Sequence, residues 1–283
     1  MPPRVVPTVR RRRLAELLKQ LRNQAGLSIE DVAAQFEWSA SKLYRIERAA
    51  HGVSVSDARL LLDLYGVSSR HDEVLSLVRD AKERGWWHSY GDALPEPFAA
   101  YVGLEQDATS MAGYSNELVP GLLQTEEYAR AVRRAYLHND DEGTTERWLA
   151  VRSKRQARLT GDDRLTYWVV LNEAVLHRPV GGQEVMNAQL RHMIELSNLP
   201  NVTIQILPFA AGAHPAMDGS FTIVRFVDQA APAIVYSEHP TSCLYLERSS
   251  DTARYTLIFD HVRARALDPD RSIGMVASLI LQT

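Results

Sequence analysis

The chain has 283 residues, about twice the length of a usual ~150-residue domain, so its length favours two domains over one. Hydrophobic residues make up 45 % and charged residues 24 %, which excludes a wholly disordered or fibrous protein. No segment approaches the ~18 consecutive apolar residues of a membrane span. The single cysteine, Cys243, excludes an internal disulfide and a multi-cysteine metal site. Because no apolar signal segment follows the basic N-terminal residues, the sequence predicts a cytoplasmic protein without membrane partners.

Charge is divided unevenly along the chain. The whole chain carries 32 Lys and Arg against 35 Asp and Glu, a net charge of −3. Residues 1–70 hold 12 basic against 7 acidic residues (+5), which leaves 20 against 28 (−8) for residues 71–283. A small basic region on a larger acidic one is typical of a nucleic-acid-binding module joined to a sensing or assembly module. Chance patchiness is the alternative interpretation.

The first seventy residues predict four short helices. Gly26 ends the first helix, which spans about residues 8–24, and Ser28, Ser39 and either Ser54 or Ser56 can cap the next three. Apolar side chains repeat at helical spacing in each of them. These side chains are Leu14, Leu17, Leu18 and Leu21 in the first helix, Ile29, Val32, Ala33 and Phe36 in the second, Leu43 and Ile46 in the third, and Ala58, Leu61, Leu62 and Tyr65 in the fourth.

The third helix has an outward face suited to DNA. Small residues at its N-terminal end permit close approach to a groove, and its cations can pair with phosphates or guanine edges. A solvated face of an all-α domain is the alternative interpretation. The outward residues are Ser39, Ala40, Ser41, Lys42, Tyr44, Arg45 and Arg48.

The segment of about residues 8–66 resembles the helix-turn-helix domain of the phage-repressor (Cro/C1-type, or XRE) family. The matching motifs are Leu-x-x-Leu-Arg at 18–22, Gly-Leu-Ser at 26–28, Val-Ala at 32–33 and Ser-x-Leu-x-Arg-Ile-Glu at 41–47. The resemblance implies that the third helix enters the major groove. It also implies an ion pair between Arg22 and Glu47 that ties the first helix to the third, so these two residues have a structural role.

The sequence departs from that family at two positions. Ile29 stands where many members have a Gln that contacts the DNA backbone, and Ala49 follows Arg48 where many have Gly. The second departure predicts either a longer third helix or a different loop before the fourth. A basic run at the chain start could add phosphate contacts, from a flexible arm or from the first turn of the first helix, or could simply be solvated. It comprises Arg10, Arg11, Arg12 and Arg13.

The rest of the chain reads as α+β. Helical patterns cover residues 71–84, 98–112, 126–132 and 145–159, and then strand patterns appear at 165–171, 202–207, 221–226, 233–236 and 243–246. Further helices are expected at 183–199, 252–266 and 273–281. The predicted fold is therefore mainly α, with a helix-turn-helix bundle over 1–70, a connecting helix and junction over 71–94, and an α+β regulatory and dimerisation domain with a mixed sheet over 95–283.

A second resemblance concerns about residues 80–280. The motifs at 84–87, 119–130, 171–176, 199–208 and 219–222 are similar, in the same order, to the large C-terminal domain of antitoxin-like transcriptional regulators from actinomycetes such as Streptomyces. The resemblance implies a regulator of development or secondary metabolism, often encoded beside a small partner protein. It supplies no ligand and no catalytic residue.

No constellation of residues indicates catalysis. The sequence lacks the glycine-rich, nucleophile-elbow and zinc-protease motifs, its nine histidines are scattered, and Cys243 reads as a small buried hydrophobe. No cofactor or metal is therefore expected. Candidates for lining a ligand pocket, with structural pairing, capping and domain packing as alternatives, are Glu105, Glu173, Glu238, Trp86 and Trp87.

The leading hypothesis is a sequence-specific transcriptional regulator that binds double-stranded DNA as a homodimer, with half-sites about one helical turn apart. Its C-terminal domain would receive a small-molecule effector or a partner protein. The alternative is an antitoxin-like interaction protein, whose C-terminal domain binds a small, separately encoded partner and whose DNA binding serves autoregulation.

Overall fold

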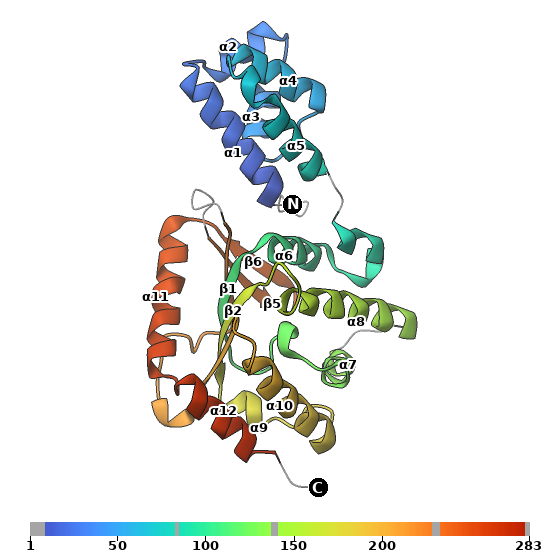
Figure 1. Cartoon of the computed structure of the whole chain (residues 1–283), viewed down its shortest axis with the longest axis vertical. Helices are drawn as coiled ribbons and strands as arrows, with labels where there is room; N and C mark the ends of the chain where they lie inside the picture. The colour runs from blue at the N-terminus through green and yellow to red at the C-terminus, as the bar shows by residue number, and fades with distance from the viewer. Residues whose placement is uncertain (1–8, 83–84, 137–140, 228–232, 281–283) are drawn as a thin grey trace. The chain divides into compact units, whose positions relative to one another are not determined.

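The computed structural model describes residues 9–82, 85–136, 141–227 and 233–280. The chain divides into two compact units, residues 1–89 and residues 90–283 (Figure 1). The 3-10 segment η2 (Trp86–Ala93), which bends at Gly91, runs from the first unit into the second along the chain.

The first unit is a helical bundle. Its elements are α1 (Val9–Gln24), α2 (Ile29–Gln35), α3 (Ala40–Glu47), α4 (Val55–Leu64), the 3-10 turn η1 (Ser68–Arg70) and α5 (His71–Lys82). The four helices predicted for the first seventy residues are confirmed. Ser28, Ser39 and Ser54 each cap a helix by accepting a hydrogen bond from the backbone N–H three residues further on, which satisfies donors that a helix start leaves unpaired.

Helix α5 is part of this bundle. It packs against α1 and α4, and its buried Val74, Leu75 and Val78 join the core formed by the leucines of α1 and α4. The sequence predicts this segment as a connecting helix, because helical spacing reveals an apolar face but not the surface that the face packs against.

The structure shows which of the two alternatives predicted from Ala49, a longer third helix or a different loop, is correct. Helix α3 ends at Glu47, and Ala49 takes a left-handed conformation with φ of 56°. The helix is therefore not extended, and a different loop leads to α4. Ala49 occupies the conformation in which a glycine carries no steric penalty.

The second unit contains a six-stranded mixed sheet. Its strands are β1 (Ser110–Ser115), β2 (Thr166–Asn172), β3 (Val202–Leu207), β4 (Phe221–Arg225), β5 (Ile234–His239) and β6 (Ser242–Leu246), in the order β3-β2-β1-β4-β5-β6. Strands β1, β2 and β3 pair in parallel, and β4, β5 and β6 add antiparallel pairs. The five strands that the sequence predicts are confirmed, with ends displaced by at most three residues.

Helices and short helical turns precede, connect and follow these strands. They are α6 (Glu96–Asp107), η3 (Gly121–Leu123), α7 (Glu126–Ala135), α8 (Glu142–Gln156), η4 (Ala157–Leu159), α9 (Ala174–His177), α10 (Gln183–Ser197), η5 (Phe209–Ala211), α11 (Ser249–Arg265) and α12 (Pro269–Ser278). The fold class is as predicted: a mainly helical chain with a helical bundle first and an α+β region after it.

The sequence-based prediction is wrong for β1, which it assigns to a helix. A helix is predicted over 98–112, but α6 ends at Asp107 and the central strand β1 begins at Ser110. Both faces of β1 are buried, so its residues do not alternate between apolar and polar. Gly113 is needed here, because a Cβ at this position would lie 2.6 Å from the backbone oxygen of Phe221 on the neighbouring β4.

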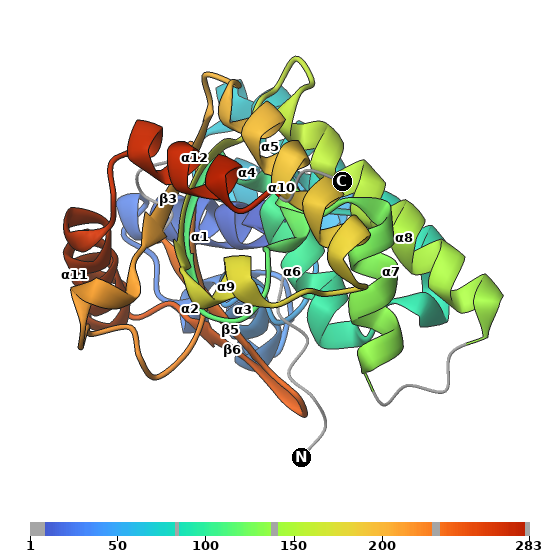
Figure 2. The ribbon, with the colours of Figure 1, turned by 90° about the horizontal axis from the view of Figure 1, so that it is seen from below.

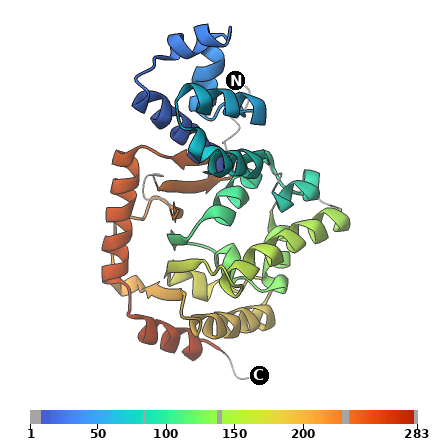
Figure 3. The same ribbon diagram turned by 45° about the horizontal axis from the view of Figure 1, so that its top comes forward.

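The sheet lies between two layers of helices. Helix α11 covers one face through Phe259 and Val262, whereas α7, α10 and α12 supply residues such as Val132, Leu190 and Val276 to the core on the other face. Figures 2 and 3 show α11 on one side of the strands and α10 on the other. Within the described ranges, no helix is long and apolar enough to cross a membrane.

Candidate nucleic-acid interface

Helix α3 presents the outward face that its sequence predicts. Leu43, Ile46 and Glu47 are buried in the bundle, and the predicted outward positions lie on the opposite side of the helix. Of the seven outward residues, Lys42 is half-buried and the others are exposed: Ser39, Ala40, Ser41, Tyr44, Arg45 and Arg48. A polar and basic surface therefore covers one side of a helix whose opposite side is fixed in the core.

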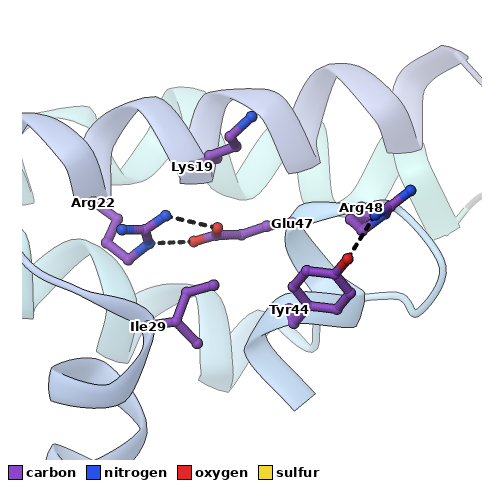
Figure 4. A pocket seen from close by; sticks show the side chains of 6 residues that line it. All are labelled: Lys19, Arg22, Ile29, Tyr44, Glu47 and Arg48. Atoms are coloured by element: carbon purple, nitrogen blue, oxygen red, sulfur yellow. Dashed lines mark hydrogen bonds and ion pairs between the residues drawn. The ribbon is translucent and has the colours of Figure 1, made fainter. Parts of the chain in front are cut away.

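An ion pair fixes the orientation of α3. Nε of Arg22 donates to Oε1 of Glu47 at 2.7 Å and Nη2 donates to Oε2 at 2.9 Å, as Figure 4 shows. Arg22 also donates to the carbonyl oxygen of Leu27 at 2.6 Å. Both side chains are nearly buried, and the hydrogen bond to Glu47 raises the pKa of Arg22. The ion pair between α1 and α3 that the resemblance implies is thus confirmed.

Lys42 differs from the other cations of α3. Its Nζ lies 3.1 Å from Oδ2 of Asp57 on α4 and 3.5 Å from the ring centroid of Trp38. Its charge is therefore already engaged inside the first unit, through an ion pair and a cation–π contact. The sequence does not reveal this, because Asp57 and Trp38 come from different elements.

Arg45 and Arg48 lie on the exposed surface. Nε of Arg45 donates to the carbonyl oxygen of Ser41 one turn back, at 3.1 Å. Nη1 of Arg48 donates to the hydroxyl of Tyr44 at 2.6 Å. Each guanidinium has further N–H groups beyond these bonds, so both side chains can donate to bases or phosphates.

A shallow groove of about 330 Å³ adjoins this surface. Figure 4 shows the six side chains that line it. They come from α1, α2, α3 and the residue that follows α3, and they are Lys19, Arg22, Ile29, Tyr44, Glu47 and Arg48. Ile29, at the first position of α2, gives the groove an apolar wall. The acidic Glu30 and Asp31 follow it, so the start of α2 is poorly suited to hold a phosphate.

The basic run at the chain start forms the first turn of α1. Arg11 is half-buried, and that burial lowers the pKa of its guanidinium. The side chains of Arg10, Arg12 and Arg13 lie outside the described part of the structure.

The five candidate pocket residues do not form one site in either unit. Trp86 and Trp87 belong to the first unit, where their rings meet edge to face with centroids 6.0 Å apart. Glu105 is buried and binds Arg155 through both carboxylate oxygens, at 2.6 and 2.8 Å. Glu173 accepts a hydrogen bond from the backbone N–H of Phe209 at 2.6 Å.

Glu238 is exposed on β5. It shares with Glu105 a through-space electrostatic effect on Arg152 of α8, whereas Glu173 directly follows β2. Sequence analysis did not single out Arg152. Its place in an arginine-rich helix is visible in the sequence, but its burial is not. Among the described residues, no group of three or more His, Cys, Asp and Glu side chains could hold a metal ion.

Two family models match the chain. A model described as a helix-turn-helix domain matches residues 13–75, which include α2, α3 and the ion pair. A model described as a domain of unknown function, DUF5753, matches residues 98–278. No curated protein and no solved structure matches the chain.

Proposed function

The chain belongs to the DUF5753 family and carries a helix-turn-helix domain, and from this we propose that it is a sequence-specific transcriptional regulator of the XRE class. The helix-turn-helix match supports a DNA-binding regulator in general. The proposal adds the mode of reading: α3 enters the major groove, and its side chains distinguish one base pair from another.

The observation that carries this proposal is the outward face of α3, held by the buried pair of Arg22 and Glu47. A recognition helix must keep a fixed angle to the groove, because a bidentate contact to a base tolerates little displacement. Arg45 is the best placed side chain to read a guanine. Arg48 and the residues of the chain start would mainly hold phosphates, and Lys42 would contribute least because Asp57 already engages it.

We propose further that the protein acts as a homodimer on an inverted repeat. One recognition helix makes few base contacts, and specific binding by such domains requires two half-sites about one helical turn apart. Because the protein must reach the chromosome, we place it in the cytoplasm. We propose regulation rather than catalysis as its role.

The DUF5753 domain is proposed to receive the regulatory input. A small-molecule effector is one possibility, and a small partner protein, as in the antitoxin-like regulators of actinomycetes, is the other. Exposed apolar side chains favour a protein partner: Phe209 and Met217, in the segment between β3 and β4, are 58 % and 66 % exposed. Purification from the native host tests this alternative, because a partner should co-purify in stoichiometric amount, and a partner-free preparation would argue for the small molecule.

The DNA-reading role is tested with Arg45→Ala. If Arg45 reads a guanine, the substitution costs ~1–3 kcal/mol of discrimination between cognate and scrambled duplexes. Fluorescence anisotropy on the duplex upstream of the protein's own gene measures both affinities.

The matched control is Arg191→Ala, which removes an exposed arginine of α10 in the other unit. We expect it to leave the preference for cognate DNA unchanged. An Arg45→Ala variant that discriminates as well as the unaltered protein would refute the assignment of Arg45 as a base-reading residue.

A further inference from the structure

Arg152 has buried donors without acceptors. This arginine lies on α8, and among the residues that the structure describes neither its Nε nor its Nη1 has a hydrogen-bond partner, although both atoms are buried. Buried N–H groups are nearly always hydrogen bonded, and an exception points to a water molecule, an ion or a ligand that completes the site. For cationic donors such as these the fitting acceptor is an anion.

The guanidinium of Arg152 is held in one place by its surroundings. Its Cζ lies 4.1 Å from the ring centroid of Trp148, one turn back on the same helix. On another side lies Gly121, the first residue of η3. A Cβ at position 121 would be 2.4 Å from Nη1 of Arg152, so a glycine is what permits this approach.

A second guanidinium converges on the same glycine. The Cβ position at Gly121 is also 3.5 Å from Nη1 of Arg155. Arg155 uses its Nε and Nη2 to bind Glu105, and this leaves Nη1 as the edge that faces Gly121. Donors from two arginines thus meet beside one backbone segment, in the arrangement by which proteins bind carboxylate and phosphate groups.

The positive charges of Arg152 and Arg155 are not fully neutralised by contacting carboxylates among the described residues. Both oxygens of Glu105 are occupied by Arg155, and Glu238 acts on Arg152 only through space. Burial first, and the positive charge of Arg155 second, lower the pKa of Arg152 to about 9. Among the described residues, the buried Arg155 and the half-buried Arg152 therefore share one contacting carboxylate, a situation that an added anion relieves.

We propose that Arg152 and the Nη1 edge of Arg155, which meet beside Gly121, form a receptor for an oxyanion, the carboxylate or phosphate group of a regulatory ligand. This inference deepens the proposed function and rests on it in one respect, namely that the DUF5753 domain receives the regulatory input.

The site is tested by nuclear magnetic resonance of the full-length, ¹⁵N-labelled protein. The Nε–H signal of Arg152 is identified by its loss in Arg152→Gln. Sodium phosphate and sodium acetate are then titrated separately, with sodium chloride keeping the ionic strength constant. We expect a saturable shift of this signal with at least one of the two salts, and the effective salt shows whether the site prefers phosphate or carboxylate.

Two further variants sharpen the test. Gly121→Ala adds the Cβ that displaces the guanidinium of Arg152, and we expect it to weaken anion binding at least tenfold. Arg147→Gln removes an exposed arginine of the same helix and should bind like the unaltered protein. No shift with either salt, or equal binding by Gly121→Ala and the unaltered protein, would overturn the proposal.

Thermal stability separates a receptor from a structural arginine. Because two buried donors of Arg152 have no acceptor among the described residues, Arg152→Gln should not lower the melting temperature in chloride buffer, and it should abolish the stabilisation by the effective anion. A lower melting temperature with an unchanged anion response would contradict the proposal. DNA binding is measured separately in the same buffer, so a failed anion site leaves the DNA-reading function standing, and failed DNA binding leaves the anion site standing.

Discussion

Glu47 is a charged residue whose side chain is buried, and buried positions are usually apolar. It is buried with Arg22 between α1 and α3, and each of its oxygens accepts one hydrogen bond from the guanidinium. Such a pair adds little stability over an apolar pair, but the loss of one partner is costly because the other remains as a buried charge. The pair therefore favours one packing of α3 over its alternatives.

Glu47→Gln should destabilise the first unit by about 3 kcal/mol or more, since it leaves Arg22 buried without its counter-ion. Urea unfolding followed by circular dichroism measures this change. The control is Glu16→Gln, which alters an exposed pair with Lys19 whose atoms are 3.7 Å apart and should cost less than about 0.5 kcal/mol. Equal effects of the two substitutions would show that the buried pair has no special role.

The surroundings of His214 lead us to expect that the stability of the second unit depends on pH. It lies in the segment between β3 and β4, where Nε2 is 3.4 Å from the hydroxyl of Tyr114 and Nδ1 accepts from the backbone N–H of Ala216. Burial first, and the charge of Arg265 second, lower the pKa of His214 in the folded state. Just below the ordinary pKa of about 6.5, His214 is therefore protonated in the unfolded chain but still neutral in the folded chain.

The contribution of His214 to stability is therefore fully present above about pH 6.5 and is lost as the pH falls toward the lowered folded pKa. We expect the second unit to unfold at lower urea concentration at pH 5.5 than at pH 7.5, and His214→Gln to reduce this difference. A variant with the full pH dependence of the unaltered protein would locate the effect in another group.

At the scale of elements, the turn between α2 and α3 is strained. Glu37 lies in this turn with φ of 54° and its side chain is exposed. A residue with a Cβ costs roughly 1–2 kcal/mol in the left-handed conformation. Glycine removes this strain, but it also increases the conformational entropy of the unfolded chain, so only part of that free energy is gained as stability.

Glu37→Gly should accordingly stabilise the first unit by about 0.5–1 kcal/mol, measured by the urea midpoint. Ala49→Gly is the instructive comparison: it relieves the same kind of strain, but it also removes a methyl group that is 3 % exposed. The two effects are of similar size and should nearly cancel. A destabilised Glu37→Gly variant would mean that the turn is not strained in solution.

The elements differ in how far their sequences predict them. The helices of the first unit carry serine caps and apolar residues at helical spacing, and these local signals predict them correctly. Strand β1 carries no such signal, because a strand buried on both faces does not alternate and its short apolar run continues the pattern of α6. Its position became clear only from its pairing with β2 and β4.

In the candidate sites too, features set by local sequence can be predicted, whereas contacts between separate elements cannot. The outward positions of α3 follow from helical spacing, and the pair of Arg22 and Glu47 follows from the family resemblance. The tie between Lys42 and Asp57, and the convergence of Arg152 and Arg155 on Gly121, are contacts between separate elements. Sequence spacing contains no information on such contacts, so they had to be found in the folded chain.

At the scale of the whole molecule, charge differs between the N-terminal seventy residues and the rest of the chain. The first seventy residues carry a net charge of +5 and the remainder −8. A positive DNA-binding unit attracts the phosphate backbone without regard to sequence, and this attraction weakens steeply with salt. Charge alone therefore cannot produce sequence-specific regulation, which requires base contacts from α3.

The most direct test of this account is the fluorescence anisotropy of the full-length protein on the duplex upstream of its own gene, compared with a scrambled duplex of equal length at two salt concentrations. Base reading by α3 predicts nanomolar binding to the native duplex, with at least a hundredfold preference over the scrambled one that persists at the higher salt. Equal and weak binding to both duplexes that vanishes at the higher salt would contradict it, because such binding reflects charge attraction alone.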